Sequence, residues 1–215
     1  MNTSNTSSRR TGDPLWRPAI GLSLFGLLGT GLVYATLATG ISGSLFPAQA
    51  DGSLIRDADG QVRGSLYLAQ PFVGDGYFQT RPSAANYDPM AAAGSNMARS
   101  NPDLVKRVGE TTAAIAAREK IDPATVPADL VTQSASGLDP ELSPAAVQVQ
   151  VARVARTRGW PEARVQTLVA VHTQNRQWGV FGQPRINIVA LNRALDQAAY
   201  APDAGRACNS AQSRP

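Results

Sequence analysis

The sequence predicts an α+β protein in which one N-terminal transmembrane helix precedes a single mixed α+β extracytoplasmic domain. Three observations support this class. Among its 215 residues, the chain carries no charge between Arg17 and Asp51, a stretch long enough to cross a bilayer. Beyond Asp51, short strand-like runs and amphipathic helical patterns occur in the same segment. That segment also has the length of one ordinary domain.

The apolar stretch is rich in large aliphatic and aromatic side chains between residues 19 and 37. They are Ile20, Leu22, Leu24, Phe25, Leu27, Leu28, Leu32, Val33 and Leu37. At about −0.3 to −0.6 kcal/mol each, they favour membrane insertion by about 3 to 5 kcal/mol before glycine and threonine offset part of it. We therefore predict a transmembrane helix with its flanks over residues 15–46.

The charges on either side of this helix predict its orientation. Arg9, Arg10 and Arg17 precede the helix, and the first charge after it is Asp51. The positive-inside rule then predicts a cytoplasmic N-terminus and an external domain. A cleaved secretory signal is the alternative, because residues 48–50 read AQA and the arginine pair resembles a twin-arginine signal. The apolar run is longer than the ~7–15 residues of a signal-peptide core, which favours a retained anchor.

Small residues recur every four positions in the predicted helix, at Gly31, Ala35, Thr39 and Gly43. This spacing places them on one helix face, where small side chains let a second helix approach closely. We expect this face to pack against another membrane helix. The alternative is the ordinary small-residue content of any membrane helix.

The domain, expected over residues 51–197, begins with a predicted β-hairpin. Two strand-like runs in residues 53–68 are joined by Asp59-Gly60, a common hairpin turn. A loop rich in proline and glycine follows over residues 70–89. Its aromatic side chains indicate either packing beneath the loop or a partner surface. They are Phe72, Tyr77, Phe78 and Tyr87.

Three helices and a C-terminal strand–helix pair are predicted next. Asn101 caps the first helix, with Pro102 at its first position. The second begins at Ser143-Pro144 and ends at Gly159, and the third begins at Pro161. Residues 185–197 read as a short strand and a last helix, whereas residues 1–14 and 198–215 are predicted to be disordered tails.

The composition excludes several kinds of site. Arginine is spread along the chain and the only lysines are Lys106 and Lys120, so no nucleic-acid surface is expected. Cys208 is the single cysteine and His172 the single histidine. These counts leave no intrachain disulfide and no metal site that needs several such ligands. No phosphate-binding P-loop motif occurs, so the chain alone is not expected to hydrolyse ATP.

One loop attracts functional interest because small polar residues gather ahead of a helix. Asp139-Pro140 reads as a turn and Ser143 as a helix cap. The residues before them offer hydroxyl and N–H groups that we expect to be exposed, suited to a partner or an anion. The candidate residues are Thr132, Gln133, Ser134, Ser136, Gly137 and Asp139.

A serine-dependent hydrolase, secreted after signal cleavage, is the alternative function. It fits the sequence poorly, because Thr132 stands where a nucleophile elbow around Ser134 needs glycine. His172 falls on the apolar face of the third predicted helix, with Val165 and Leu168. We therefore predict no catalytic residue.

Four stretches, in this order behind the N-terminal span, carry a family resemblance. They are YFQTRPSAANYD, GSNMARSNPDL, VPADLVTQSASGLDPELSPAAVQVQVARVARTRG and GQPRINIVALNRALD. Together they resemble the C subunit of the bacterial Kdp potassium-transporting ATPase, over roughly residues 15–196. Two positions depart from the family pattern: Ala69 replaces a glycine, and Gln133 replaces a small residue.

The resemblance implies an accessory subunit of a high-affinity potassium uptake complex in the bacterial inner membrane. Its partners would be a P-type subunit that hydrolyses ATP and a channel-like subunit that translocates K⁺. The C subunit would be needed for assembly and stability, and would act as a catalytic chaperone that raises the affinity for ATP. ATP is the one cofactor implied. Because ATP is cytoplasmic and the domain is predicted to be periplasmic, we expect that effect to pass through the membrane subunits.

Overall fold

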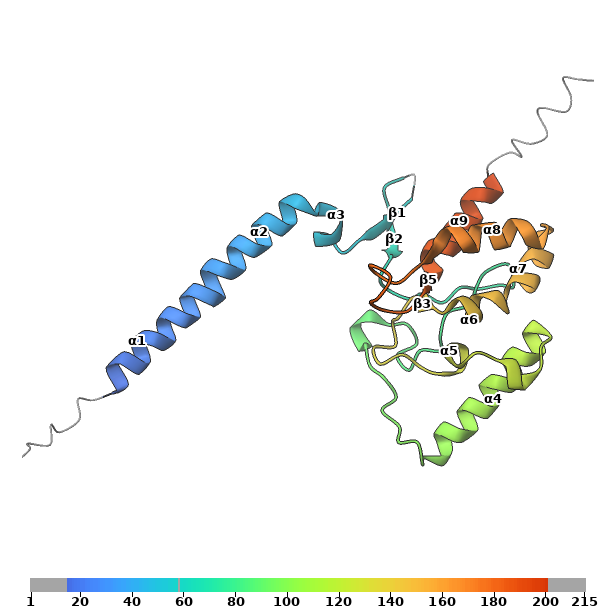
Figure 1. Ribbon diagram of the computed structural model, residues 1–215, viewed down its shortest axis with the longest axis horizontal. Helices are drawn as coiled ribbons and strands as arrows, with labels where there is room; N and C mark the ends of the chain where they lie inside the picture. The colour runs from blue at the N-terminus through green and yellow to red at the C-terminus, as the bar shows by residue number, and fades with distance from the viewer. Residues whose placement is uncertain (1–14, 58, 201–215) are drawn as a thin grey trace, which may run out of the picture. The chain divides into compact units, whose positions relative to one another are not determined.

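The computed structural model describes residues 15–57 and 59–200 (Figure 1). The chain divides after Gly52 into an N-terminal helical unit and a mixed domain. The predicted tail 1–14 lies outside the described residues. The predicted boundary at residue 198 was wrong for the first three residues of the tail, because the last helix continues to Tyr200.

The N-terminal unit is dominated by one continuous helix, Trp16–Leu45. It consists of α1 (Trp16–Gly26), the π-helical segment η1 (Leu27–Tyr34) and α2 (Ala35–Leu45). By length and composition it could cross a membrane. The short α3 (Pro47–Ala50) follows. Pro47 ends the longer helix because proline has no backbone N–H to donate to the carbonyl four residues earlier.

Three hydroxyl groups in this helix are satisfied within it. Thr30 and Thr36 each donate to the carbonyl oxygen four residues earlier, at 2.6 Å, and Ser44 does so at 2.9 Å. Such bonds remove the cost of an unpaired donor in an apolar environment. The polar residues are therefore compatible with the transmembrane prediction.

The domain begins with the predicted hairpin, β1 (Leu54–Arg56) and β2 (Val62–Ser65). The strands are antiparallel, with a register irregularity after Ile55. Asn187 ties the end of the hairpin to the rest of the domain, since its Nδ2 donates to the Leu66 carbonyl at 2.7 Å.

The helices of the domain follow in chain order. They are α4 (Pro102–Glu119), α5 (Ala128–Val131), α6 (Pro144–Gln148), α7 (Val151–Arg158), α8 (Glu162–His172) and α9 (Ile188–Tyr200), with short 3₁₀ turns η2 (Pro89–Ala91) and η3 (Pro123–Thr125). The caps predicted at Asn101 and Ser143 are confirmed. Asn101 accepts from the Asp103 N–H at 2.8 Å, and Ser143 accepts from the Ala146 N–H at 3.3 Å.

The prediction of one continuous helix from Pro144 to Gly159 was wrong. The helix breaks at Val149 and Gln150, and α7 begins at Val151. At the break the Gln150 N–H donates to the Val147 carbonyl at 3.0 Å, which tightens the turn to an i→i−3 bond. The Gln150 side chain turns inward at this place, where it is fully buried.

A small antiparallel sheet joins distant parts of the domain. Its order is β3 (Glu141–Leu142), β5 (Arg185–Asn187) and β4 (Thr173–Gln174). Helices α6, α8 and α9 contact β5, and α7 packs against α8 (Figure 1). The core is made of aliphatic side chains from α6 to α9 together with Phe78, Ile115, Leu130, Leu142 and Ile186.

Two buried amide side chains hold the irregular segment Asp75–Gln79 against the core. Asn192 accepts from the Phe78 N–H and donates to the Phe78 carbonyl, both at 2.9 Å. Gln150 does the same for Gln79, at 2.8 and 3.2 Å. Each amide thus supplies the pair of bonds that a neighbouring β-strand would otherwise supply.

Arg153 completes this support with a buried ion pair. Its guanidinium donates to the carbonyls of Asp75 and Tyr77 and to the Gln150 side chain. It also pairs with the fully buried Glu119 carboxylate at 2.9 Å. A buried charge is tolerated when it is paired and hydrogen-bonded in this way, so α4, α7 and the Asp75–Gln79 segment are held together.

The aromatic residues of the 70–89 loop serve packing. Phe78 is fully buried in the core and Phe72 packs against its edge. Tyr77 donates to Asp196 at 3.2 Å, and Tyr87 donates to the Arg81 carbonyl at 2.8 Å. Of the two interpretations left open by the sequence, packing beneath the loop is confirmed.

Replacing Asn192 by alanine tests the amide support. Asn192→Ala leaves the buried N–H and carbonyl of Phe78 without partners, so we expect a loss of about 2 to 4 kcal/mol in the free energy of unfolding. Chemical denaturation of the full chain measures it. The control is Asn175→Ala at an exposed position, expected to change stability by less than about 0.5 kcal/mol. Equal stability of the two variants would contradict the role given to Asn192.

Candidate functional site

The loop Thr132–Asp139 connects α5 to β3 and contains all six predicted site residues of the domain. Its exit has the predicted geometry. Asp139 Oδ1 accepts from the Glu141 N–H at 2.9 Å, which fixes the turn. The Ser143 N–H in turn donates to Asp129 at 2.9 Å, which links this turn back to α5.

Close packing explains most of the small residues in this loop. A side chain at Gly137 would place its Cβ 2.8 Å from the Ala93 carbonyl oxygen, and the φ of +71° disfavours other residues as well. A Cβ at Gly94 would lie 2.8 Å from the Ala135 oxygen. The two backbones therefore meet directly. The expectation of an exposed loop was wrong for Ser134 and Gly137, which are buried, whereas Thr132 and Ser136 are exposed.

Several of the predicted hydrogen-bonding groups are used inside the loop. The Gly137 N–H donates to the Ser134 carbonyl at 3.3 Å, and the Leu138 N–H donates to Ser136 Oγ at 3.1 Å. The Thr132 hydroxyl donates to the Ala128 carbonyl at 2.8 Å. These internal hydrogen bonds give the loop its shape, and they leave fewer hydroxyl and N–H donors for an anion than the sequence predicted.

Arg81 fastens this loop to the preceding one. Its guanidinium contacts Asp139 Oδ2 at 3.0 Å and Thr132 Oγ1 at 3.1 Å. A hollow of about 700 Å³ lies beside it, lined by Tyr67, by Arg81 and by loop residues from Gln133 to Glu141. The side-chain oxygen of Gln133 is buried without a hydrogen-bond partner, which leaves an acceptor unused at this place.

A second hollow, of about 380 Å³, shares Arg81, Asp139 and Glu141 with the first and extends to residues 183–185. Arg185 forms an ion pair with Glu141 at 2.9 Å across it. The loop is therefore continuous with the hairpin between β4 and β5. We call the surface formed by residues 132–141 and 175–185 the loop–hairpin face.

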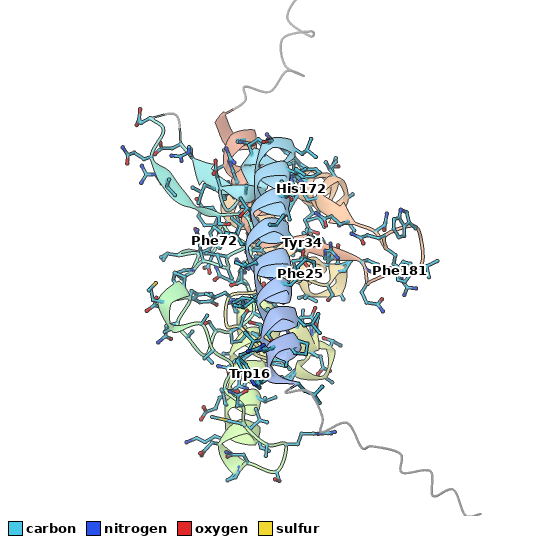
Figure 2. The ribbon with its side chains drawn as sticks, turned by 90° about the vertical axis from the view of Figure 1, so that its left-hand side faces the viewer. Trp16, Phe25, Tyr34, Phe72, His172 and Phe181 are labelled. Carbon is cyan, nitrogen blue, oxygen red and sulfur yellow. The ribbon has the colours of Figure 1, made fainter. Side chains whose placement is uncertain are left out.

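The tip of the hairpin exposes apolar side chains. Trp178 is 90% and Phe181 61% exposed, with Val180 between them. The two rings touch edge to face, with centroids 6.0 Å apart. Figure 2 shows Phe181 at the outer end of this hairpin. No role was predicted for these residues, although the run Trp-Gly-Val-Phe-Gly at residues 178–182, in which two aromatic residues each precede a glycine, was the available signal.

His172 lies at the end of α8, half-buried, with its Nδ1 2.9 Å from the Leu168 carbonyl oxygen of the same helix (Figure 2). This is the structural role indicated by its place on the helix face. Within residues 15–57 and 59–200, no three His, Cys, Asp or Glu side chains are grouped so as to hold a metal ion.

The four predicted packing residues of the membrane helix lie at Gly31 in η1 and at Ala35, Thr39 and Gly43 in α2. An added Cβ at Gly43 would meet nothing within 4 Å, and one at Gly31 would meet only Leu27 Cδ1 at 3.9 Å. Nothing within this helix requires these glycines.

The comparisons with known proteins agree on one family. The family model KdpC, described as "K+-transporting ATPase, c chain", matches residues 16–197. A potassium-transporting ATPase KdpC subunit of Xanthomonas campestris pv. campestris is 57% identical over 194 residues, which cover 90% of this chain and 92% of that protein. Those of Shewanella putrefaciens and Geobacter sulfurreducens are 53% and 46% identical, over 79% and 84% of this chain and 84% and 96% of theirs. The chain therefore belongs to the KdpC family, the C subunits of K⁺-transporting ATPases.

Proposed function

We propose that this chain is a membrane-anchored accessory subunit that assembles with the ATP-hydrolysing and K⁺-translocating subunits of a potassium uptake complex. The observation that carries the assembly role is the loop–hairpin face, which exposes Trp178 and Phe181 at the tip of its hairpin. Its partner surface belongs to another subunit of the complex. The chain itself contributes no catalytic group.

The chemistry of this face suits a protein partner. Aromatic and arginine side chains are enriched at interfaces, where they supply large contact areas and directional hydrogen bonds. Trp178 has a φ of +51°, a conformation that costs a non-glycine residue about 1 to 2 kcal/mol. An exposed indole in a strained conformation supports a binding role, because neither feature stabilises the isolated domain.

Removing the aromatic tip tests the assembly role. In the double variant Trp178→Ser and Phe181→Ser, co-purification with a tagged ATP-hydrolysing subunit should fall at least about tenfold, because interfacial aromatic residues are each worth ~2 kcal/mol or more. The melting temperature of the chain alone should stay unchanged. The matched control is Val73→Ser with Met90→Ser, which removes side chains that are 89% and 93% exposed outside the face. An equal loss in test and control would rule out the face as the interface.

We propose that the effect on ATP affinity passes through this assembly. A subunit that binds one conformation of its partner more tightly shifts the partner's equilibrium, and with it the affinity for a distant ligand. This route needs no ATP site on the C subunit. The aromatic double variant should then raise the KM for ATP of the complex, and the change should be reversed by excess wild-type chain. An unchanged KM in a complex that has lost the C subunit would contradict the coupling.

The proposed orientation places the N-terminus in the cytoplasm and the domain in the periplasm of the inner membrane. It is supported by Arg9, Arg10 and Arg17 ahead of the helix. Alkaline phosphatase fused after Ala198 should be active, because that enzyme works only when exported. β-Galactosidase fused at the same residue should be inactive. The opposite pair of activities would reverse the orientation.

The small-residue face of the helix is the proposed contact within the membrane. Gly31→Leu adds bulk without polarity and fits the isolated helix, since the nearest atom to a new Cβ is 3.9 Å away. We expect at least about tenfold less co-purification of the larger subunits with unchanged membrane insertion, because close helix approach is lost. Leu28→Ala is the control, since it lies outside this row of small residues. If both variants assemble equally well, another face makes the contact.

A further inference from the structure

A groove of about 550 Å³ lies between the β1–β2 hairpin and α9, apart from the loop–hairpin face. Its volume falls within the range of ordinary small-molecule sites, about 300 to 1,000 Å³. The hairpin and the helix are held in place around it. Gln70 Nε2 donates to the Arg63 carbonyl at 3.2 Å, and Asn187, just before α9, holds the end of the hairpin.

One part of the groove is apolar. Ile55 from β1, Phe72 from the following loop and Val189 from α9 line it. Phe72 lies 5.7 Å from the Tyr77 ring between centroids, which supports its position. Val189 is buried, whereas Ile55 and Phe72 are only partly covered. An apolar group of a ligand would bury the part of these side chains that the domain leaves exposed.

The carboxylates in the groove are already neutralised. Asp57 pairs with Arg63 at 2.6 Å, and Asp196 pairs with Arg158 at 2.9 Å. The hydrogen bond from Arg63 holds the pKa of the Asp57 carboxyl below its usual value. Asp57 therefore stays ionised at neutral pH and continues to compensate Arg63.

Two further arginines, Arg56 and Arg193, line the groove and are not paired with a carboxylate in the described part of the chain. Arg56 donates to the Gly60 carbonyl at 3.1 Å, and neither Arg56 nor Arg193 forms an ion pair with any residue that the structure describes. Both are exposed. The groove thus has an excess of positive charge beside an apolar surface, from guanidinium groups that favour phosphate and carboxylate.

We propose that this groove binds an amphipathic anion, a phosphoryl group that carries an apolar chain. Arg56 and Arg193 bind the phosphoryl oxygens, and the chain lies on Ile55, Phe72 and Val189. Two sources share this chemistry: the headgroup of an anionic lipid and a soluble organic phosphate. Strand β1 begins at Leu54, nine residues after the helix Trp16–Leu45 ends, so the groove is joined to the proposed membrane anchor by a short connection.

Two probes separate the phosphoryl and apolar parts of the proposed site. Inorganic phosphate tests the phosphoryl part alone, and hexyl phosphate adds an apolar chain. The full chain is reconstituted in nanodiscs of zwitterionic phosphatidylcholine and titrated calorimetrically with each. Hexyl phosphate should bind at least about tenfold more tightly than inorganic phosphate, a difference of about 1.4 kcal/mol. Ile55→Ser should narrow this difference while leaving the binding of inorganic phosphate unchanged.

Charge removal gives the second comparison. Arg56→Gln with Arg193→Gln should weaken hexyl phosphate binding at least about tenfold. The control, Arg99→Gln with Arg156→Gln, removes the same charge from exposed positions outside the groove and should leave binding unchanged.

Nanodiscs that contain phosphatidylglycerol, an anionic lipid, identify the source of the ligand. Loss of the hexyl phosphate signal there assigns the groove to a lipid headgroup, and a retained signal assigns it to a soluble phosphate. No saturable binding by the wild type, or equal weakening in the control, would overturn the proposal.

Discussion

The domain depends on one constraint: the segment Asp75–Gln79 places Phe78 in the core without a neighbouring strand. Its backbone groups must still be paired, because a buried and unpaired N–H or carbonyl costs about 1 to 3 kcal/mol. Asn192 and Gln150 supply the missing bonds to Phe78 and Gln79. Phe78 can therefore occupy the centre of the core although it lies in an irregular loop.

The same constraint connects the distant parts of the chain. Arg153 joins the segment to Glu119 in α4, and Asn192 joins it to α9. Arg158 donates to the Gly76 carbonyl at 2.6 Å and pairs with Asp196, which lines the groove proposed to bind an anion. Elements that are far apart in sequence thus share one partly buried network of hydrogen bonds and ion pairs. Such a network favours a single arrangement of these elements, because moving one element would leave the polar groups that it pairs without partners.

The loop–hairpin face lies outside this network, whereas the groove shares Asp196 with it. The loop–hairpin face consists of a tightly packed loop, fastened by Arg81, and a hairpin whose apolar tip has no cover. This division suits the proposed assembly role, in which the core maintains the shape and the exposed tip is the proposed contact. Exposed apolar groups contribute to binding through the same burial that stabilises a core, about 25 cal/mol for each Å² removed from water.

The features that depend on local sequence were predictable. Asn101, Ser143 and the Asp59-Gly60 turn act through bonds to residues two to four positions away, and each was identified from its neighbours. The break at Gln150 was not, because the inward turn of this side chain depends on Gln79, 71 positions earlier. The burial of Gly137 likewise depends on contact with residues 83–93. The exposure of Trp178 and Phe181 was not predicted, because a short hairpin tip has no periodic pattern of apolar residues.

Hydrogen exchange on the chain, alone and in the assembled complex, tests most directly whether a fixed core presents the loop–hairpin face to a partner. The N–H groups of Phe78 and Gln79 should exchange slowly in both states, because Asn192 and Gln150 hold them. Those of residues 175–183 have hydrogen bonds only within an exposed hairpin tip. In the chain alone they should exchange faster than the N–H groups of Phe78 and Gln79, and in the complex at least about tenfold more slowly than in the chain alone, as burial at an interface requires. Unchanged exchange at residues 175–183 on assembly, with protection appearing elsewhere on the domain, would contradict the account.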